Sequence, residues 1–222
     1  MALPRFLLRQ GFHLLYNQLA WTYDAVAWSV SFGQWGAWRR CAIPFLQPGP
    51  VLELAYGTGG LFVDLVRRGW QPAGIDLSPY MARLARRRLR RFDPRLPSPL
   101  VRAQAQALPF PSGTFANAVA TFPTEYIMDP ASLAEVRRVL WSENSSGGQG
   151  APGQLIIVAE GKLKGPWPLQ PLVEGLYRFT GQRRIPPAGP LPHLARQGFI
   201  ARWETVTVDE ATAHIVVAKR RN

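Results

Sequence analysis

The sequence predicts an α/β protein, a single Rossmann-like, doubly wound domain with a seven-stranded, mostly parallel sheet and helices on both faces. Two observations predict it. From residue 51 to residue 160, short apolar segments alternate with segments of helical periodicity. After them, two β-rich segments with few residues between them end the chain, as an antiparallel hairpin requires. With 222 residues, 47% of them hydrophobic, the chain can bury one core of this kind.

The expected elements follow in a regular order. VLELAYGTGG, residues 51–60, predicts a strand and a glycine-rich turn, and LFVDLVRRG after it predicts a helix with one buried side. Further helices are expected at SPYMARLARRRLRRF, with Ser78 as N-cap, and at DPASLAEVRRVLW from Asp129. The other strands are expected at QPAGID (71–76), PLVRAQA around residue 100, FANAVATF from Phe115, QLIIVAE from Gln154, GFIARWETVTV and ATAHIVVAKR.

The domain divides into four expected parts. They are an N-terminal helical cap (1–45), a cofactor-binding core (46–160), a proline-rich substrate cover (161–192) and the C-terminal hairpin (193–222). The polar, glycine-rich SENSSGGQGA after Trp141 is expected to be a surface loop.

Charge and cysteine content limit the classes of function. A net charge of +12 would suit nucleic acid, an anionic membrane surface or acidic substrates. The positive charge is almost all arginine, however, with much alanine and proline, as a GC-rich coding bias also produces. The one cysteine, Cys41, excludes an internal disulfide and a zinc cluster, so we expect no metal site and a cytoplasmic location. No apolar stretch is long enough to span a bilayer.

The glycine turn and a following aspartate predict a nucleoside site. Glycines let the backbone approach a ligand, and the helix that begins after them presents unpaired N–H groups. Asp76 ends the second expected strand, 19 residues after Gly57, where a carboxylate can accept both ribose hydroxyls; it could also simply cap the next helix. A dinucleotide is disfavoured, because Phe62 replaces the third small residue of GxGxxG and no Tyr-x-x-x-Lys pair is present.

Several stretches together resemble the class I S-adenosylmethionine-dependent methyltransferases, most closely the C-methyltransferases of ubiquinone and menaquinone synthesis. They are YNQLAWTYDAVAW, VLELAYGTGG, GIDLSPYMARLAR, QAQALPFPSGTFANAVATF, ASLAEVRRVL and QLIIVAE. The resemblance implies S-adenosylmethionine as cofactor. Glu53 would organise the turn and the cofactor's amino group, Asp76 would bind its ribose, and Leu77 would pack on its adenine. The full set of implied cofactor-binding residues is Tyr23, Glu53, Ala55, Tyr56, Gly57, Gly59, Asp76, Leu77, Gln104 and Ala105.

The chain departs from the family pattern at three places. Gln104 stands where an aspartate commonly accepts the adenine amino hydrogen, and its side-chain carbonyl can still do so. Ala55 stands where glycine is usual. Ala116 stands where Phe-Asp is usual, and we expect it to lose only a surface or capping acid. Tyr23 would reach the cofactor's carboxylate or the substrate, or else be a core aromatic.

Methyl transfer chiefly needs the acceptor atom and the methyl carbon to be held together in a dry pocket. The candidates for a base on the substrate side are Glu125, Tyr126, Glu160 and His193, with none preferred. Thr121-Phe122-Pro123-Thr124 lacks the Asn/Asp-Pro-Pro-Tyr/Phe pattern of the DNA and protein N-methyltransferases, and strand four ends without the acids of the metal-dependent catechol enzymes. A small, lipophilic or quinone-like acceptor is therefore expected.

The helix after Asp76 carries an arginine-rich side, which is usually a solvated surface. Its members are Arg83, Arg86, Arg87, Arg90 and Arg91, opposite Met81, Ala85, Leu89 and Phe92. The same side would suit peripheral contact with an anionic membrane surface. Two other functions stay open: a catalytically degenerate binding protein of the same fold, and an RNA methyltransferase, although the sequence disfavours nucleic acid as a partner. The oligomeric state is not predicted.

Overall fold

The computed structural model describes residues 31, 33–95, 99–142, 151–162 and 189–221. The strands are β1 (Val51–Leu54), β2 (Pro72–Asp76), β3 (Leu100–Arg102), β4 (Asn117–Thr121), β5 (Gln154–Lys162), β6 (Phe199–Val208) and β7 (Ala211–Arg220). The helices are α3 (Trp35–Arg40), α4 (Gly60–Arg67), α5 (Pro79–Phe92), α6 (Pro130–Val139) and α8 (Leu191–Arg196), with 3-10 turns η2 (Ile43–Phe45) and η3 (Glu125–Met128).

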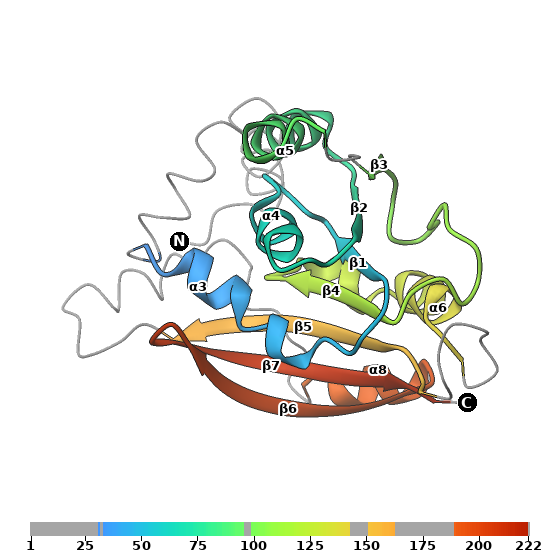
Figure 1. Ribbon diagram of the computed structural model, residues 1–222. Coiled ribbons are helices and arrows are strands. Elements are labelled where there is room, and N and C mark those ends of the chain that lie inside the picture. Colours follow the sequence, from blue (N-terminus) through green and yellow to red (C-terminus); the bar gives the residue numbers. More distant parts are fainter. Residues whose placement is uncertain (1–30, 32, 96–98, 143–150, 163–188, 222) are drawn as a thin grey trace, which may run out of the picture.

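The strands form one seven-stranded sheet in the order β3-β2-β1-β4-β5-β7-β6 (Figure 1). The first five strands of that order are parallel, and β7 runs antiparallel to both β5 and β6. The direction of winding reverses between β1 and β4, which are direct neighbours with Val51 opposite Asn117. The predicted fold class is therefore confirmed, including the antiparallel hairpin at the end of the chain.

Helices cover both faces of the sheet. All four residues of β1 are buried, and neighbouring residues of the strand pack against helices on opposite faces. Val51 packs with Trp35 and Trp38 of α3 and with Leu61 and Leu65 of α4. The next residue, Leu52, points to the opposite face and packs with α6 and α8 through Leu133, Val136 and Leu194. On the first face α5 lies beside α4. Since side chains of a strand alternate between faces, one four-residue strand fixes both layers.

Buried amides join the strands at the edge where the parallel strands begin. The Asn117 side chain accepts a hydrogen bond from the Gln47 N–H at 3.0 Å and donates to the Gln47 carbonyl at 2.8 Å. The Gln154 amide donates to the same Asn117 oxygen at 3.0 Å. Ala116, beside them, is fully buried. Of the two roles expected for the acid that Ala116 replaces, surface or capping, the surface role is wrong, because position 116 faces the core next to Gly49.

Other details differ from the sequence predictions. Phe92 is 40% exposed instead of lying on the buried side of α5, because Met81, Ala82, Ala85 and Leu89 form that side. The short helix α8 before the hairpin was not predicted. Tyr23, the 143–150 part of the expected loop and residues 163–188 of the expected cover lie outside the described residues. Within the described ranges, no helix has the length and apolar character that crossing a membrane requires.

Candidate functional site: a crevice at the carboxyl ends of the strands

A crevice of about 750 Å³ lies where the parallel strands end. Each lining segment among the described residues directly follows or ends a strand. The described lining residues are Ala55 and Gly57 after β1, Ile75 to Pro79 around the end of β2, Arg102 to Gln106 after β3, and Thr121 to Thr124 with Tyr126 after β4. This position, beside the reversal of strand order between β1 and β4, is where open α/β sheets bind ligands. The volume lies within the range of small-molecule sites.

The glycines of the turn serve different purposes. Gly57 has φ of 55°, a backbone conformation that favours glycine, although an added Cβ would meet no atom within 4 Å. Gly59 has φ of 75°, and its Cβ would lie 2.8 Å from the Cβ of Ala85 in α5. Gly59 therefore lets α5 pack against the turn, whereas Gly57 leaves the backbone bare towards the crevice.

Asp76 holds the turn and the next helix together. One carboxylate oxygen accepts the Gly57 N–H at 2.9 Å, and the other accepts the Ser78 N–H at 2.8 Å. The residue is only 9% exposed. Burial raises the pKa of the Asp76 carboxyl, while the backbone hydrogen bonds from Ser78 and Gly57 oppose that rise. Each oxygen keeps a further lone pair, so the same carboxylate can also accept hydroxyls of a ligand in the crevice. The capping interpretation and the ribose interpretation are therefore compatible.

The predicted adenine contacts lie on one wall of this crevice. Leu77 is 56% exposed, which is unusual for leucine and leaves an apolar surface towards a ligand. Gln104 is exposed and Ala105 is buried, and both line the crevice. Arg102 donates from Nε to the Leu77 carbonyl at 3.0 Å, which joins the ends of β2 and β3.

Three of the predicted cofactor residues that the structure describes do not line the crevice: Gly59, which packs against α5, and Glu53 and Tyr56. Glu53 faces the α3 and α4 side of β1 and is 2% exposed, with Oε2 buried and without a hydrogen-bond partner. Burial raises the pKa of Glu53 to about 8, although Arg39 nearby acts to lower it. The Tyr56 side chain packs with Phe62 and Ala82, and burial raises its pKa to about 12. Their implied part in cofactor binding stays a prediction.

The four candidate bases do not come together. Tyr126 lines the crevice and its hydroxyl lies 3.5 Å from the Leu54 carbonyl. Glu125, next to it, is exposed and does not line the crevice. Glu160 lies on β5 opposite His214 of β7, and His193 lies in α8, the helix before β6. Neither Glu160 nor His193 is among the described residues of the crevice.

Phe122 is a site residue that the sequence analysis did not single out for contact. It has φ of 48°, a left-handed conformation that is rare for a bulky residue. Its N–H donates to the Val158 carbonyl at 2.8 Å, and its ring stacks on Trp35 with centroids 4.2 Å apart. Strained residues of this kind often lie at functional sites. A positive φ at phenylalanine leaves no signal in the sequence, so this turn could not be predicted.

Comparison with known proteins identifies the family. Residues 51–143 match the family model described as "Methyltransferase domain". The chain is 31% identical over 232 aligned positions to a demethylmenaquinone methyltransferase of Thermus thermophilus, covering 90% of this chain and 98% of that protein. A ubiquinone/menaquinone biosynthesis C-methyltransferase of Syntrophotalea carbinolica is 28% identical, covering 80% and 70%. The fold matches a Thermotoga maritima structure described as an S-adenosylmethionine-dependent methyltransferase and possible histamine N-methyltransferase (TM-score 0.63, 17% identity, 95% and 99% covered).

The fold and crevice are those of a class I S-adenosylmethionine-dependent methyltransferase, and the chain belongs to that class. Within it, the chain belongs to the branch that contains the demethylmenaquinone methyltransferases and the ubiquinone/menaquinone biosynthesis C-methyltransferases.

The described residues fit S-adenosylmethionine, the cofactor of this class. A bare backbone at Gly57, an exposed apolar Leu77 and a buried carboxylate with remaining lone pairs lie around one crevice. These groups suit the cofactor's methionine part, adenine and ribose, in that order. The assignment of each residue to each part is an inference from chemistry and resemblance.

The Asp76 assignment predicts a loss of cofactor affinity. In Asp76→Asn the amide nitrogen cannot accept a hydrogen bond, so either the turn or the ribose loses a charge-assisted bond. We expect S-adenosylmethionine to bind about ten- to a hundredfold more weakly, measured by calorimetric titration. Asp93→Asn is the matched control, since Asp93 lies outside the crevice. Unchanged affinity in Asp76→Asn would contradict the assignment.

The left-handed conformation of Ala55 predicts that glycine is more stable there. Ala55 has φ of 53° and is exposed at the crevice. Glycine would relieve a conformational strain of about 1–2 kcal/mol in the folded state. This gain exceeds the loss of stability that the greater conformational entropy of glycine in the unfolded chain causes, about 0.4–1 kcal/mol. We expect Ala55→Gly to raise the free energy of unfolding by roughly 0.5–1 kcal/mol in urea titrations. Ala103 has no positive φ, so Ala103→Gly should lower the free energy of unfolding. A change of the same sign in both variants would refute the explanation.

Buried Glu53 predicts a pH-dependent stability. Its pKa is about 8 in the folded chain and has an ordinary value of 4.5, so the folded state retains the proton more strongly. The corresponding stability is complete below the ordinary value and is lost as the pH rises towards about 8. Urea unfolding at several pH values should show this decline in the wild type and less of it in Glu53→Gln. Exposed Glu125→Gln should leave the slope unchanged, and parallel profiles for all three proteins would contradict the prediction.

Proposed function

We propose that the chain transfers a methyl group from S-adenosylmethionine to a ring carbon of a small, lipophilic, quinone-like acceptor in its reduced form. The observation that carries this proposal is the acceptor side of the crevice, which is built after β4 from Phe122, Pro123, Thr124 and Tyr126. Aromatic and apolar groups dominate this wall, and none of these four described residues carries a charge. Such a wall suits a planar hydrophobic ring better than a charged amine or a nucleotide.

The names of the relatives point in the same direction. The Thermus thermophilus relative, named for demethylmenaquinone, aligns with 90% of this chain and 98% of its own length. Another relative, 32% identical over 57% of this chain, is named for 2-phytyl-1,4-naphthoquinone. Both names describe a ring system with a long apolar tail. We therefore take a 2-prenyl-1,4-naphthoquinol as the acceptor to be tested first.

The chemistry needs little from the protein beyond placement. The cofactor supplies an electrophilic methyl group on a sulfonium. An electron-rich ring carbon of the quinol forms the new C–C bond as the S–CH₃ bond breaks; the sulfonium becomes a thioether and the ring proton leaves to solvent or a base. Holding both reactants in line in a dry pocket supplies a large part of the rate enhancement. The reduced ring is required because a quinone carbon is itself electrophilic.

Of the four candidate bases, Tyr126 is the one that lines the crevice. Its hydroxyl lies near the Leu54 carbonyl at 3.5 Å, at the long limit of a hydrogen bond, and its oxygen can accept one from an acceptor hydroxyl. We assign it to positioning the quinol hydroxyl over the crevice. The strained Phe122, stacked on Trp35, forms the neighbouring part of the wall.

The acceptor proposal is tested with labelled S-adenosylmethionine and purified protein. We expect methyl transfer to a chemically reduced 2-prenyl-1,4-naphthoquinol and little or none to its oxidised form or to histamine. Tyr126→Phe should raise KM for the quinol by about five- to tenfold, the value of one lost neutral hydrogen bond, with a smaller change in kcat.

The control for Tyr126→Phe is Glu125→Gln, its exposed neighbour, which should behave as the wild type. Binding of S-adenosylmethionine without methyl transfer to any quinol would contradict the proposed acceptor. It would not contradict the assignment of the chain to the methyltransferases. A fall in kcat with unchanged KM in Tyr126→Phe would instead assign the hydroxyl to the chemical step.

A further inference from the structure

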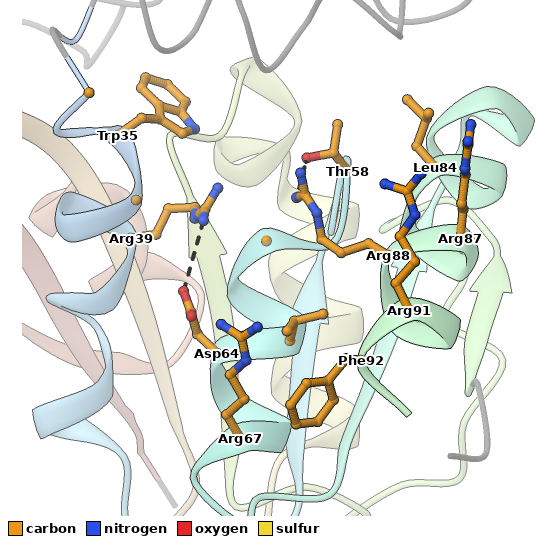
Figure 2. A pocket seen from close by; sticks show the side chains of 14 residues that line it. Trp35, Arg39, Thr58, Asp64, Arg67, Leu84, Arg87, Arg88, Arg91 and Phe92 are labelled. Carbon is orange, nitrogen blue, oxygen red and sulfur yellow. Dashed lines mark hydrogen bonds and ion pairs between the residues drawn. The ribbon is translucent and has the colours of Figure 1, made fainter. Parts of the chain in front are cut away.

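A second hollow lies on the other side of the glycine turn, between α3, α4 and α5. It measures about 700 Å³, and its described lining includes five arginines, Arg39, Arg67, Arg87, Arg88 and Arg91, but only one acid, Asp64. Figure 2 shows these side chains converging from the three helices. We refer to this hollow as the arginine groove. None of its described residues lines the cofactor crevice.

Helical spacing explains why the arginines gather. In α5, Leu84, Arg87, Arg88 and Arg91 follow the i, i+3, i+4, i+7 pattern and so lie on one side of the helix. In α4, Gly60, Val63, Asp64 and Arg67 repeat the same spacing. Arg83 and Arg90 lie on the adjoining side of α5, outside the groove. One face of α4 and one face of α5 thus form two walls of the groove, and α3 contributes Trp35, Gly36 and Arg39.

Small residues bring these faces close enough to share a ligand. Gly59 contacts Ala85, which lets α5 approach the turn. Arg88, three residues beyond Ala85, then donates to Oγ1 of Thr58 at 2.9 Å. Gly60 leaves room for the guanidinium of Arg39, since an added Cβ would collide with it. The close packing of the three helices is therefore combined with a concentration of positive charge.

Three of the five arginines are held in place by the protein. Arg39 lies 3.8 Å from Asp64, Arg88 is bonded to Thr58, and the Arg67 guanidinium lies 5.0 Å from the centre of the Phe92 ring. This contact also accounts for the exposed position of Phe92. Arg87 and Arg91 are exposed. The groove thus offers fixed guanidiniums together with two that can close on a ligand.

Gathering like charges is unfavourable unless an anion compensates them. Guanidinium groups bind phosphate oxygens in paired, charge-assisted hydrogen bonds, and the Thr58 hydroxyl adds a neutral partner. Nucleic acid is a poorer match. Of the two aromatic side chains in the described lining, Trp35 is only 9% exposed and Phe92 already has the Arg67 guanidinium over its ring, which leaves a base little aromatic surface on which to stack.

We propose that the arginine groove is a binding site for a phosphate group, either that of a small phosphorylated molecule or that of an anionic phospholipid. The second source would bring the enzyme to the membrane in which a prenylated acceptor dissolves, and this part rests on the proposed function. The site itself does not. Phosphate binding is measured without acceptor or methyl transfer, so failure of the quinol assay and failure of this proposal are distinguishable.

The test compares two double variants of the same helix. Arg87→Gln with Arg91→Gln removes two charges from the groove, and Arg83→Gln with Arg90→Gln removes two charges from the adjoining side. All four residues are exposed, so both variants should fold. Inorganic pyrophosphate is titrated calorimetrically into each protein. Vesicles of phosphatidylglycerol and phosphatidylcholine, in a ratio of about one to two, are used in parallel sedimentation.

We expect the groove variant to bind at least about tenfold more weakly than the wild type, and the control variant to stay within about twofold. This pattern with pyrophosphate alone assigns the site to a soluble phosphate compound. The same pattern with vesicles, together with release by added pyrophosphate, assigns it to a lipid headgroup.

Three results would overturn the proposal. The first is that the wild type binds neither probe, which flat titrations and unsedimented protein would show. The second is an equal loss of binding in both double variants, which would assign binding to the net charge or to the adjoining hollow that Arg83, Arg87, Arg90 and Arg91 also line. Binding to single-stranded RNA but to neither phosphate probe would show a nucleic-acid surface instead.

Discussion

The structure depends most on the carboxylate of Asp76, which bonds the Gly57 N–H of one βα turn and the Ser78 N–H of the next. These two bonds set the distance between the ends of β1 and β2 and hence the width of the crevice. Ser78 in turn caps α5 by accepting the Met81 N–H. A single side chain therefore links the cofactor turn, the second strand and the start of the arginine-bearing helix.

Much of this arrangement could be predicted from the sequence because it follows from local patterns. Strand-turn-helix units, the N-caps Ser78 and Asp129 and the two terminal strands are all readable from residue order. The position of Asp76 was predictable for the same reason, since a residue that ends a parallel strand must lie at the carboxyl edge of the sheet.

The details that could not be predicted depend on contacts between distant segments or on backbone conformation. Ala116 is buried beside Gly49, a residue that is distant from it in the sequence. The left-handed φ values of Ala55 and Phe122 occur at residues that rarely adopt them. The exposure of Phe92 depends on Arg67 from the neighbouring helix. The sequence could not decide between the candidate bases either. Glu125 and Tyr126 are adjacent in sequence, yet of these two only Tyr126 lines the crevice.

The glycine turn connects the crevice with the arginine groove. Gly57 lines the crevice, whereas Thr58 and Gly60 line the groove, so successive residues of one short segment serve two hollows. S-adenosylmethionine carries a positive sulfonium, and the groove concentrates five guanidiniums on the other side of the same backbone. A phosphate bound among them would lower the positive potential felt in the crevice, since Coulomb interactions act across the thin turn. Phosphate in the groove and cofactor in the crevice would therefore favour each other's binding, as linkage requires of any coupled pair.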